Sequence, residues 1–159
     1  MDKLWAPWRI NYVSSKVKTK GCIFCQAKKN NAVGQVIFKT KRSVCLLNIY
    51  PYNNGHLLVS PLRHIADIEL LSPEEILDMF ASVKRAKRLL TKVLNPQGYN
   101  LGFNLGKSGG AGIIGHLHLH IVPRWAGDTN FMPVTGNTKV IAQSLGELAK
   151  RLKNAEKSN

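Results

Sequence analysis

Two stretches of the chain carry apolar residues at helical spacing, and the first has clear ends. Ser72-Pro73-Glu74-Glu75 offers an N-capping serine, a proline in the first turn and a glutamate placed to close a capping box. Asn95-Pro96 stops the pattern, because proline cannot continue a helix. The pattern between them predicts one long amphipathic helix. Its apolar positions are Ile76, Phe80, Val83, Leu90 and Leu94.

A second amphipathic helix is predicted from about Lys139 to Lys153. Its apolar residues fall on one helical stripe. They are Ile141, Leu145, Leu148 and Leu152. The last residues, 154–159, are expected to form a loosely held tail, and the first turns of the chain are expected to be equally loose.

The other apolar segments are short and bounded by turn residues, which is typical of β-strands. They are Gln35–Phe38, Val44–Ile49, His56–Val59, Tyr99–Leu105 and His116–Val122. A tight reversal at Tyr50–Gly55, rich in proline and asparagine, would make the second and third strands a hairpin. Strands that follow one another directly, then a helix, then more strands predict an α+β fold on an antiparallel sheet.

Length and composition fit a single domain over residues 1–159, with an N-terminal segment at about 1–30. The chain is 44% hydrophobic and 8% aromatic, which allows one sizeable core. No apolar run reaches the roughly 20 residues that span a bilayer, and the N-terminus lacks a secretory signal. We therefore expect a cytoplasmic protein without a membrane partner. Three cysteines are too few for a disulfide framework and favour a reduced compartment.

The charge is strongly positive and favours polyanionic partners. Twenty-three lysines and arginines against nine acidic residues give a formal charge of +14. Nucleotides, nucleic acid and an anionic membrane would all suit it. The excess can equally be solvated surface, because many of the cations lie in a predicted helix or near the C-terminus. These are Lys84, Arg85, Lys87, Arg88, Lys92, Lys150, Arg151, Lys153 and Lys157.

The most informative segment is His116-Leu117-His118-Leu119-His120. In a strand, strict alternation places the three imidazoles on one face and the leucines, with Ile121, on the other. One face then carries chemistry and the other packs into the core. For this segment alone, a purely structural or metal-binding strand is the alternative.

A glycine-rich turn, Asn104–Gly112, leads into the histidine segment. Its glycines let backbone N–H groups approach an anion, and Lys107 and Ser108 could add contacts. Taken alone it is a flexible loop, and it lacks the G-x-x-x-x-G-K-[ST] pattern of a P-loop. Beside three histidines, phosphate is its natural ligand.

Cys22-Ile23-Phe24-Cys25 is the second group of residues that suggests chemistry. A lone CxxC fits a zinc site, a redox pair or chance, and without a second CxxC a metal site needs distant ligands. Cys45 lies in an apolar stretch and is expected to be a buried small side chain.

The His-x-His-x-His segment, followed by apolar residues, resembles the histidine-triad motif of nucleotidyl hydrolases and transferases. Further matches run through most of the chain. They are Leu47-Asn48, Pro51-x-x-x-Gly55-His56 and Leu57-Leu58-Val59-x-Pro61-x-x-His64. Two other segments are similar to a bacterial branch that includes diadenosine tetraphosphate phosphorylases. These are Trp5-Ala6-Pro7-Trp8-Arg9 and Val122-Pro123-Arg124-Trp125-x-Gly127-Asp128-x-Asn130-Phe131.

The resemblance implies a fold and a set of catalytic residues. The fold is a five-stranded antiparallel sheet with one long helix and a C-terminal helix, paired into a homodimer. His118 matches the nucleophile that attacks the α-phosphorus and forms a covalent nucleotidyl-histidine, a role that suits a neutral imidazole. His120 matches a phosphate-contacting residue, and His56 matches a further active-site histidine.

The same resemblance implies the nucleotide contacts. Asn48 matches a ribose-contacting position, and Asn104 with the glycine loop matches the wall that holds the phosphate and the leaving group. Gly112-Ile113 stand where related proteins often carry glutamine and serine or threonine, so the leaving-group contact is open, with Ser108 or Lys107 as the candidate substitutes. The nucleotide- and phosphate-binding candidates are Asn48, Asn104, Lys107, Ser108, Gly110, Gly112 and His120.

A zinc-bearing subset of this family joins an N-terminal CxxC to two histidines. These are the histidine of the Pro-x-x-His segment and the first histidine of the triad. In this chain the ligands would be Cys22, Cys25, His64 and His116. Two thiolates and two imidazoles would make a closed, structural Zn²⁺ site that orients rather than catalyses.

The implied reaction is nucleotidyl transfer from a dinucleoside polyphosphate in two displacements, with water or inorganic phosphate as the final acceptor. Phosphorolysis needs a second anion site, for which Lys107 with Arg9 or Arg124 is the candidate. Three alternatives stay open. They are hydrolysis of nucleoside phosphoramidates, removal of adenylate from nucleic-acid ends, and nucleotide binding without catalysis.

Overall fold

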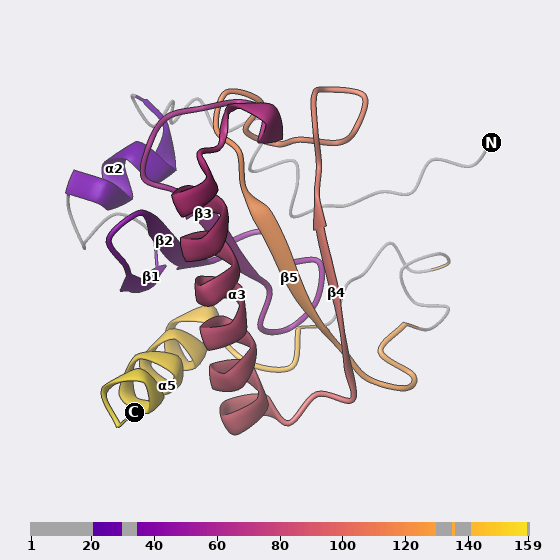
Figure 1. The fold of residues 1–159 in the computed structure, drawn as a ribbon. Coiled ribbons are helices and arrows are strands. Elements are labelled where there is room, and N and C mark those ends of the chain that lie inside the picture. Colours follow the sequence, from indigo (N-terminus) through magenta and orange to yellow (C-terminus); the bar gives the residue numbers. More distant parts are fainter. Residues whose placement is uncertain (1–20, 30–34, 130–134, 136–140, 159) are drawn as a thin grey trace.

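An antiparallel sheet forms the centre of the molecule (Figure 1). The computed structural model describes residues 21–29, 35–129, 135 and 141–158. Within this part of the chain the sheet has five strands in the order β1-β2-β3-β5-β4. Their bounds are β1 (Gln35–Lys39), β2 (Ser43–Leu47), β3 (Leu57–Pro61), β4 (Gly98–Phe103) and β5 (Leu119–Arg124). The expected α+β fold with a five-stranded antiparallel sheet is confirmed.

The long helix α3 (Pro73–Leu94) begins and ends where the sequence predicts. The Ser72 hydroxyl accepts from the Glu75 N–H at 3.3 Å, and the Glu75 carboxylate accepts from the Ser72 N–H at 2.9 Å. This is the predicted capping box. Asn95 ends the helix in a left-handed conformation, with a φ of 46°.

The buried face of α3 differs from the predicted apolar stripe. Ile76 and Phe80 are 40% and 55% exposed. The face toward the sheet instead includes Ser82 and Ala86, which are both buried. The Ser82 hydroxyl lies 2.7 Å from the hydroxyl of Ser43. The other predicted positions are correct, because Val83 and Leu90 are buried in the core and Leu94 packs against it. The apolar pattern missed part of the buried face because it counted neither a hydrogen-bonded serine nor an alanine as core.

The reversal between β2 and β3 is a hairpin, as expected, and the two strands pair antiparallel. Gly55 in this reversal has a φ of +78°. A Cβ at this position would lie 2.5 Å from Cδ1 of Leu94, at the end of α3. The hairpin can approach the helix this closely because the residue is glycine.

The C-terminal helix α5 (Leu145–Lys157) starts later than predicted. The Ser144 hydroxyl caps it by accepting from the Glu147 N–H at 3.2 Å, which places Ile141 before the helix. The predicted first residue, Lys139, lies outside the described residues.

The expected loose tail at 154–159 is wrong as far as Lys157, because α5 continues to that residue. Ala155 packs against the hydrophobic core, and Glu156 forms an ion pair with Arg85 of α3. These contacts hold the last turns of the helix. The first turns of the chain, which were also expected to be loose, lie outside the described residues.

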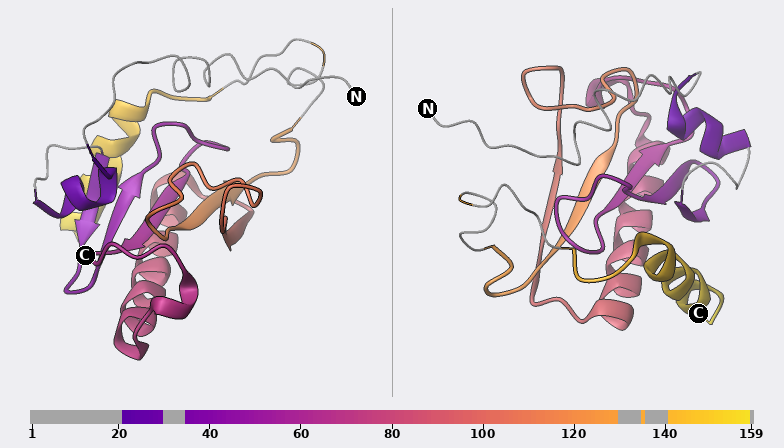
Figure 2. Two further views of the ribbon diagram at one scale, coloured as in Figure 1. Left: turned by 90° about the horizontal axis from the view of Figure 1, so that it is seen from above. Right: turned by 180° about the vertical axis from the view of Figure 1, so that it is seen from behind.

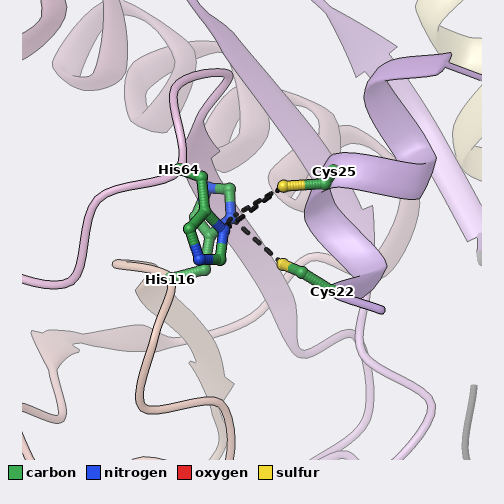
Figure 3. Close-up of side chains that lie close together, drawn as sticks. All are labelled: Cys22, Cys25, His64 and His116. Carbon is green, nitrogen blue, oxygen red and sulfur yellow. Dashed lines mark hydrogen bonds between the residues drawn. The ribbon is translucent and has the colours of Figure 1, made fainter. Parts of the chain in front are cut away.

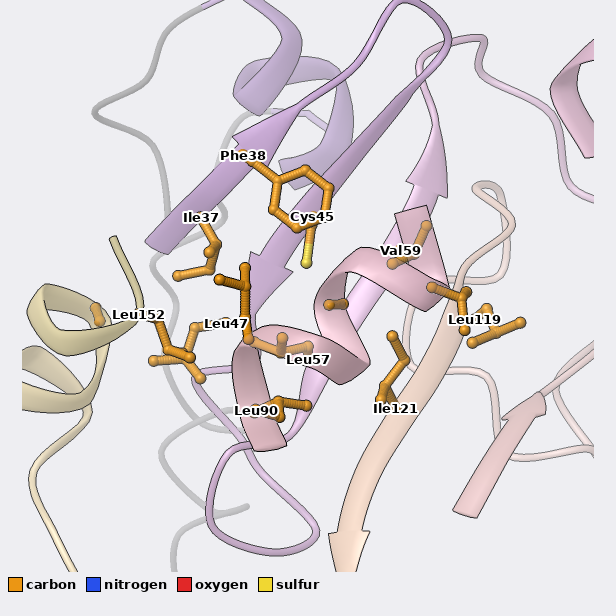
Figure 4. Close-up of a cluster of buried hydrophobic side chains, with 14 of the residues drawn as sticks. Ile37, Phe38, Cys45, Leu47, Leu57, Val59, Leu90, Leu119, Ile121 and Leu152 are labelled. Carbon is orange, nitrogen blue, oxygen red and sulfur yellow. The ribbon is translucent and has the colours of Figure 1, made fainter. Parts of the chain in front are cut away.

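Helices cover both faces of the sheet (Figures 1 and 2). α3 and α5 pack on one face, and the main core between them and the strands includes Leu57, Leu90 and Ile121 (Figure 4). Cys45 lies in this core, fully buried as expected, and burial raises the pKa of its thiol. The short helix α2 (Ile23–Lys29) packs Phe24 against the other face.

A 3-10 turn, η1 (Ile68–Leu70), lies between β3 and α3. Asp67 caps it by accepting from the Glu69 N–H at 3.3 Å. Among the described residues, no helix is both long enough and apolar enough to cross a membrane.

Candidate active site and metal centre

The triad histidines are all buried, although only the last of them lies in a strand. β5 starts at Leu119, so the strand predicted over His116–Val122 began too early. Ahead of β5, the Leu117 N–H donates to the Ile65 carbonyl at 2.7 Å. The Ser60 hydroxyl donates to the Leu117 carbonyl at 2.9 Å. These two bonds satisfy the backbone N–H and carbonyl of Leu117 without strand pairing.

His118 is oriented by the backbone of its own segment. Its Nδ1 lies 2.8 Å from the His116 carbonyl oxygen, and because a carbonyl only accepts, Nδ1 carries the proton. The lone pair of the neutral ring is therefore on Nε2. Burial lowers the pKa of His118, and the bond to the carbonyl only partly opposes this shift. His118 is thus neutral near pH 7 with an unprotonated Nε2.

A chain of hydrogen bonds sets the protonated nitrogen of His120. The Tyr52 N–H donates to Nδ1 of His56 at 2.9 Å, so a neutral His56 carries its proton on Nε2. That nitrogen lies 2.9 Å from Nδ1 of His120 and donates to it. Burial, and then the neighbouring His118, lower the pKa of His120 to about 4. His120 is therefore neutral at pH 7 and presents an N–H donor from Nε2.

Asn104 and Tyr52 both reach His120. The Asn104 Nδ2 lies 3.4 Å from Nε2 of His120 and 3.1 Å from the Tyr52 hydroxyl. The Tyr52 ring stacks on His120 with an angle of 10° between the planes and 5.2 Å between the centroids. The sequence did not single out Tyr52. Its only signal is an aromatic residue in a reversal that ends at His56.

Asn48 lies beside His56. Its Oδ1 accepts from the Tyr50 N–H at 2.9 Å, and its Nδ2 lies 3.2 Å from Nδ1 of His56. Asn48 therefore helps to hold the reversal and His56 in place. Both the oxygen and the nitrogen of its amide contact these groups. Its expected contact with a ribose stays a prediction.

The glycine-rich turn reaches the histidines through its first residue, Asn104. Gly106 has a φ of 67°, and Gly110, with a φ of 86°, donates its N–H to the Lys107 carbonyl at 3.1 Å. The turn is therefore folded tightly on itself. Its remaining candidates are exposed, and their phosphate contacts stay predictions. These are Lys107, Ser108, Gly110 and Gly112.

Four side chains gather where α2 meets the segment before β5 (Figure 3). They are Cys22, Cys25, His64 and His116, and their ligand atoms all lie within 4.8 Å of one another. The His116 Nδ1 is 3.1 Å from the Cys22 sulfur and 3.1 Å from the His64 Nδ1. The structure thus brings together the four residues that the sequence analysis proposed as metal ligands.

The donor set and the spacing fit a tetrahedral zinc ion. Zn–S bonds of about 2.3 Å and Zn–N bonds of about 2.0–2.1 Å give N–N and N–S edges of roughly 3.3–3.6 Å. The N–N distance between the two histidines and three of the N–S distances in the cluster run from 3.1 to 3.6 Å. The His116 Nε2 donates to the Pro61 carbonyl at 2.9 Å, which leaves Nδ1 as the ligand atom.

Phe24 connects the four-residue cluster with His118. Its ring centroid lies 5.0 Å from that of His116 and 5.1 Å from that of His118. Phe24 is buried, and it stands between the two cysteines in the chain. Holding α2 in place therefore also holds the wall beside His118.

Arg124, a candidate for the second anion site, pairs with neighbouring polar side chains in the structure. Its guanidinium donates to both oxygens of Asp128, at 2.7 and 2.9 Å, and to Asn100 Oδ1 at 2.6 Å. The hydrogen bond from Arg124 is the main reason that the pKa of Asp128 falls to about 2. The expected role of Arg124 in a second anion site stays a prediction. Trp5–Arg9 and residues 130–131, which carried part of the branch resemblance, lie outside the described residues.

Comparison with known proteins identifies the family to which this arrangement belongs. The model of the HIT domain matches residues 29–127. This chain belongs to the HIT family. The AP-4-A phosphorylase of Mycobacterium tuberculosis strain H37Rv is 37% identical to this HIT protein over 161 residues. The match covers 96% of this chain and 83% of the relative.

Two further matches extend the likeness to other HIT proteins. The asymmetrical bis(5'-nucleosyl)-tetraphosphatase of Schizosaccharomyces pombe is 35% identical over 94 residues, which cover 59% of this chain and 51% of the relative. Among solved structures, a Zn-bound histidine triad family protein from Mycobacterium smegmatis matches with a TM-score of 0.70 and 28% identity. That match covers 87% of this chain and 94% of the other.

Proposed function

We propose that this HIT protein cleaves dinucleoside polyphosphates at the α-phosphate through a covalent nucleotidyl-histidine on His118. One observation carries the proposal. His118 has its proton on Nδ1, bound to the His116 carbonyl, and its Nε2 is unprotonated. A buried neutral imidazole held in this way can act as a nucleophile. The names of two relatives, a phosphorylase and a tetraphosphatase, support the substrate class.

The proposed reaction takes two displacements. In the first, Nε2 of His118 attacks the α-phosphorus, an N–P bond forms, and the P–O bond to the polyphosphate leaving group breaks. In the second, an oxygen of inorganic phosphate or water attacks the same phosphorus and gives up its proton to solvent. The N–P bond then breaks and His118 is neutral again. The Nε2–H of His120 donates to an oxygen of the α-phosphate and stabilises the charge that develops there.

We further propose that inorganic phosphate is the acceptor, so that diadenosine tetraphosphate yields ADP and ATP. The residues that resemble the phosphorylase branch support this choice, as does the 37% identity to an AP-4-A phosphorylase. A hydrolase would use water on the same intermediate and release AMP and ATP.

A product analysis tests the acceptor. The panel contains diadenosine polyphosphates and a nucleoside phosphoramidate, each with and without radioactive inorganic phosphate. Faster cleavage with phosphate, and label in ADP, would support phosphorolysis. Release of AMP and ATP without label would make the protein a hydrolase and leave the nucleotidyl intermediate standing. Binding of these nucleotides without any turnover would contradict the enzymatic proposal.

We propose a structural Zn²⁺ at Cys22, Cys25, His64 and His116. Their donor types and spacing support the proposal, as does the Zn-bound relative from M. smegmatis. Side chains would fill all four coordination positions, so the ion would cross-link three segments of the chain rather than bind substrate. The three segments are α2, the residues after β3 and the residues before β5.

We also propose a homodimer of single-domain chains over residues 1–159, acting in the cytoplasm. β4 is an edge strand, so its outer backbone groups can pair with a second copy, and Leu101 on it is 51% exposed. The free cysteines suit a reducing compartment. A nucleic-acid partner stays an alternative supported by the charge of +14.

A further inference from the structure

A carboxylate that follows β5 is bonded to the reversal between β2 and β3. The Asn53 Nδ2 donates to Oδ2 of Asp128 at 2.7 Å and to the Pro123 carbonyl at 3.1 Å. Asn53 and Asp128 are 75 positions apart in the chain. The bond between them therefore ties the reversal, which carries His56, to the end of the strand that carries His120.

Asp128 is held in place by its own neighbours. Its carboxylate accepts two bonds from Arg124, at 2.7 and 2.9 Å, and one from the Trp125 N–H at 3.1 Å. Gly127, with a φ of 74°, allows the tight turn in which the Asp128 N–H donates to the Trp125 carbonyl. The hydrogen bond from Arg124 is the main reason that the pKa of Asp128 is about 2. The carboxylate is therefore ionised near pH 7 and presents a fixed acceptor.

The orientation of the Asn53 amide follows from its partners. A carbonyl and an ionised carboxylate only accept, so the amide nitrogen must face Pro123 and Asp128. The amide oxygen accepts from the Asn54 N–H at 2.9 Å. Both ends of the Asn53 side chain are thus bonded, and its place in the reversal is fixed.

Asn53 in turn holds His56. The His56 N–H donates to the Asn53 carbonyl at 3.2 Å. Tyr52, the residue before Asn53, donates its N–H to Nδ1 of His56 at 2.9 Å, which leaves the His56 proton on Nε2. That proton is donated to Nδ1 of His120, so His120 keeps its own proton on Nε2. The position of Asn53 therefore affects which nitrogen of His120 faces a substrate as a donor.

We propose that Asp128 and Asn53 are positioning residues, which hold the reversal so that the proton of His120 stays on Nε2. The inference rests on the proposed function, in which that N–H donates to the α-phosphate. When the bond between Asn53 and Asp128 is cut, the Tyr52 N–H is no longer held on Nδ1 of His56. His56 can then carry its proton on Nδ1 and accept from Nδ1 of His120. In that state Nε2 of His120 carries a lone pair, where the phosphate oxygen needs a donor.

Two variants cut the bond from its two ends. Asn53→Ala removes the donor, and Asp128→Ala removes the acceptor. Asn100→Ala is the matched control, because it removes another bond of the Arg124 guanidinium, at 2.6 Å, and leaves Asn53 and Asp128 in place. Circular dichroism checks that each variant is folded.

Nitrogen-15 NMR measures the tautomers of His56 and His120 without substrate, because a protonated ring nitrogen resonates far from one with a lone pair. The wild type and Asn100→Ala should show protonated Nε2 in both rings. Asn53→Ala and Asp128→Ala should each show a mixture of tautomers. The double variant should match the more affected single variant, because both changes break the same bond.

Steady-state kinetics with diadenosine tetraphosphate give the second readout. Asn53→Ala and Asp128→Ala should lower kcat about tenfold and keep KM within twofold, because the His120 donor acts on charge that develops in the transition state. Asn100→Ala should match the wild type in both constants.

The two readouts keep this inference apart from the proposed function. If the wild type binds nucleotides without turnover, mixed tautomers in Asn53→Ala and Asp128→Ala still support the positioning role while the enzymatic proposal fails. If the wild type turns over and both variants keep its tautomers, the positioning role is overturned while the role of His118 stands. Wild-type kcat and KM in variants with mixed tautomers would overturn it as well.

Discussion

At the residue scale, the catalytic proposal depends on the positions of two protons. The His116 carbonyl holds one on Nδ1 of His118, and the chain through His56 holds the other on Nε2 of His120. One ring therefore offers a lone pair, and its neighbour offers an N–H. Attack on a phosphate needs both, a nucleophile and a donor to the oxygen that gains charge.

His118→Ala should lower kcat by at least about 10⁴-fold, because it removes the nucleophile. His120→Ala should be milder, about 10²–10³-fold, because it removes one donor and leaves the nucleophile in place. Steady-state kinetics measure both effects. Circular dichroism should be unchanged in both variants, and AMP binding should be largely unchanged in His118→Ala. Near-normal turnover by His118→Ala would mean that another group attacks the phosphorus.

At the element scale, the four-residue cluster joins α2 to two other segments, the residues after β3 and the residues before β5. Protein purified without added metal should contain one zinc per chain. Cys25→Ala should lose the zinc and lower Tm by on the order of 5 °C, because α2 loses its cross-link. Cys45→Ala is the matched control, since Cys45 lies in the core on the opposite face, and it should keep its zinc. Metal-free protein that is nonetheless folded and active would refute the zinc proposal.

The capping box of α3 also predicts a dependence of stability on pH. Arg63 donates to both oxygens of Glu75, at 3.0 and 2.7 Å, and this is the main reason that the pKa of Glu75 falls from 4.5 to about 2. A depressed carboxylate pKa stabilises the fold above pH 4.5, and the stabilisation is lost as the pH falls toward 2. Denaturant titrations between these pH values should show a weaker loss of stability in Glu75→Gln than in the wild type. If the free energy of unfolding fell equally with pH in both proteins, the stabilising role of the Arg63–Glu75 ion pair would be contradicted.

The elements also show which features the sequence could predict. The ends of α3 were predictable because the capping box and Asn95-Pro96 act locally. Its buried face was predicted only in part, because the core also accepts Ser82 through a hydrogen bond to Ser43. The start of β5 was predicted too early, because the Ile65 carbonyl and the Ser60 hydroxyl bond to the backbone of Leu117 in place of strand pairing.

At the scale of the whole molecule, both candidate sites are products of the fold. Cys25 is 39 positions from His64 and 91 from His116, so spacing alone could not join them, and the family resemblance did. The triad could be recognised in the sequence because its three histidines alternate within the single short segment His116–His120. Tyr52 was missed because the reversal brings it to His120 from far along the chain.

The edge strand makes a prediction about assembly. Leu101→Glu, on β4, should shift the protein from dimer to monomer, because a buried unpaired charge at the interface is costly. Light scattering after size exclusion measures the mass. Leu70→Glu, at an exposed apolar residue of η1, is the control and should stay dimeric. A wild-type monomer at micromolar concentration would contradict the proposed homodimer.

The most direct test of the central claim is the stereochemical course at the α-phosphorus. A substrate made chiral at that atom, with sulfur and oxygen isotopes, reports whether one displacement or two have occurred. Each in-line displacement inverts the phosphorus, so attack by His118 followed by attack of the acceptor predicts net retention. Net inversion would mean that the acceptor attacks the substrate directly, and it would contradict the covalent nucleotidyl-histidine.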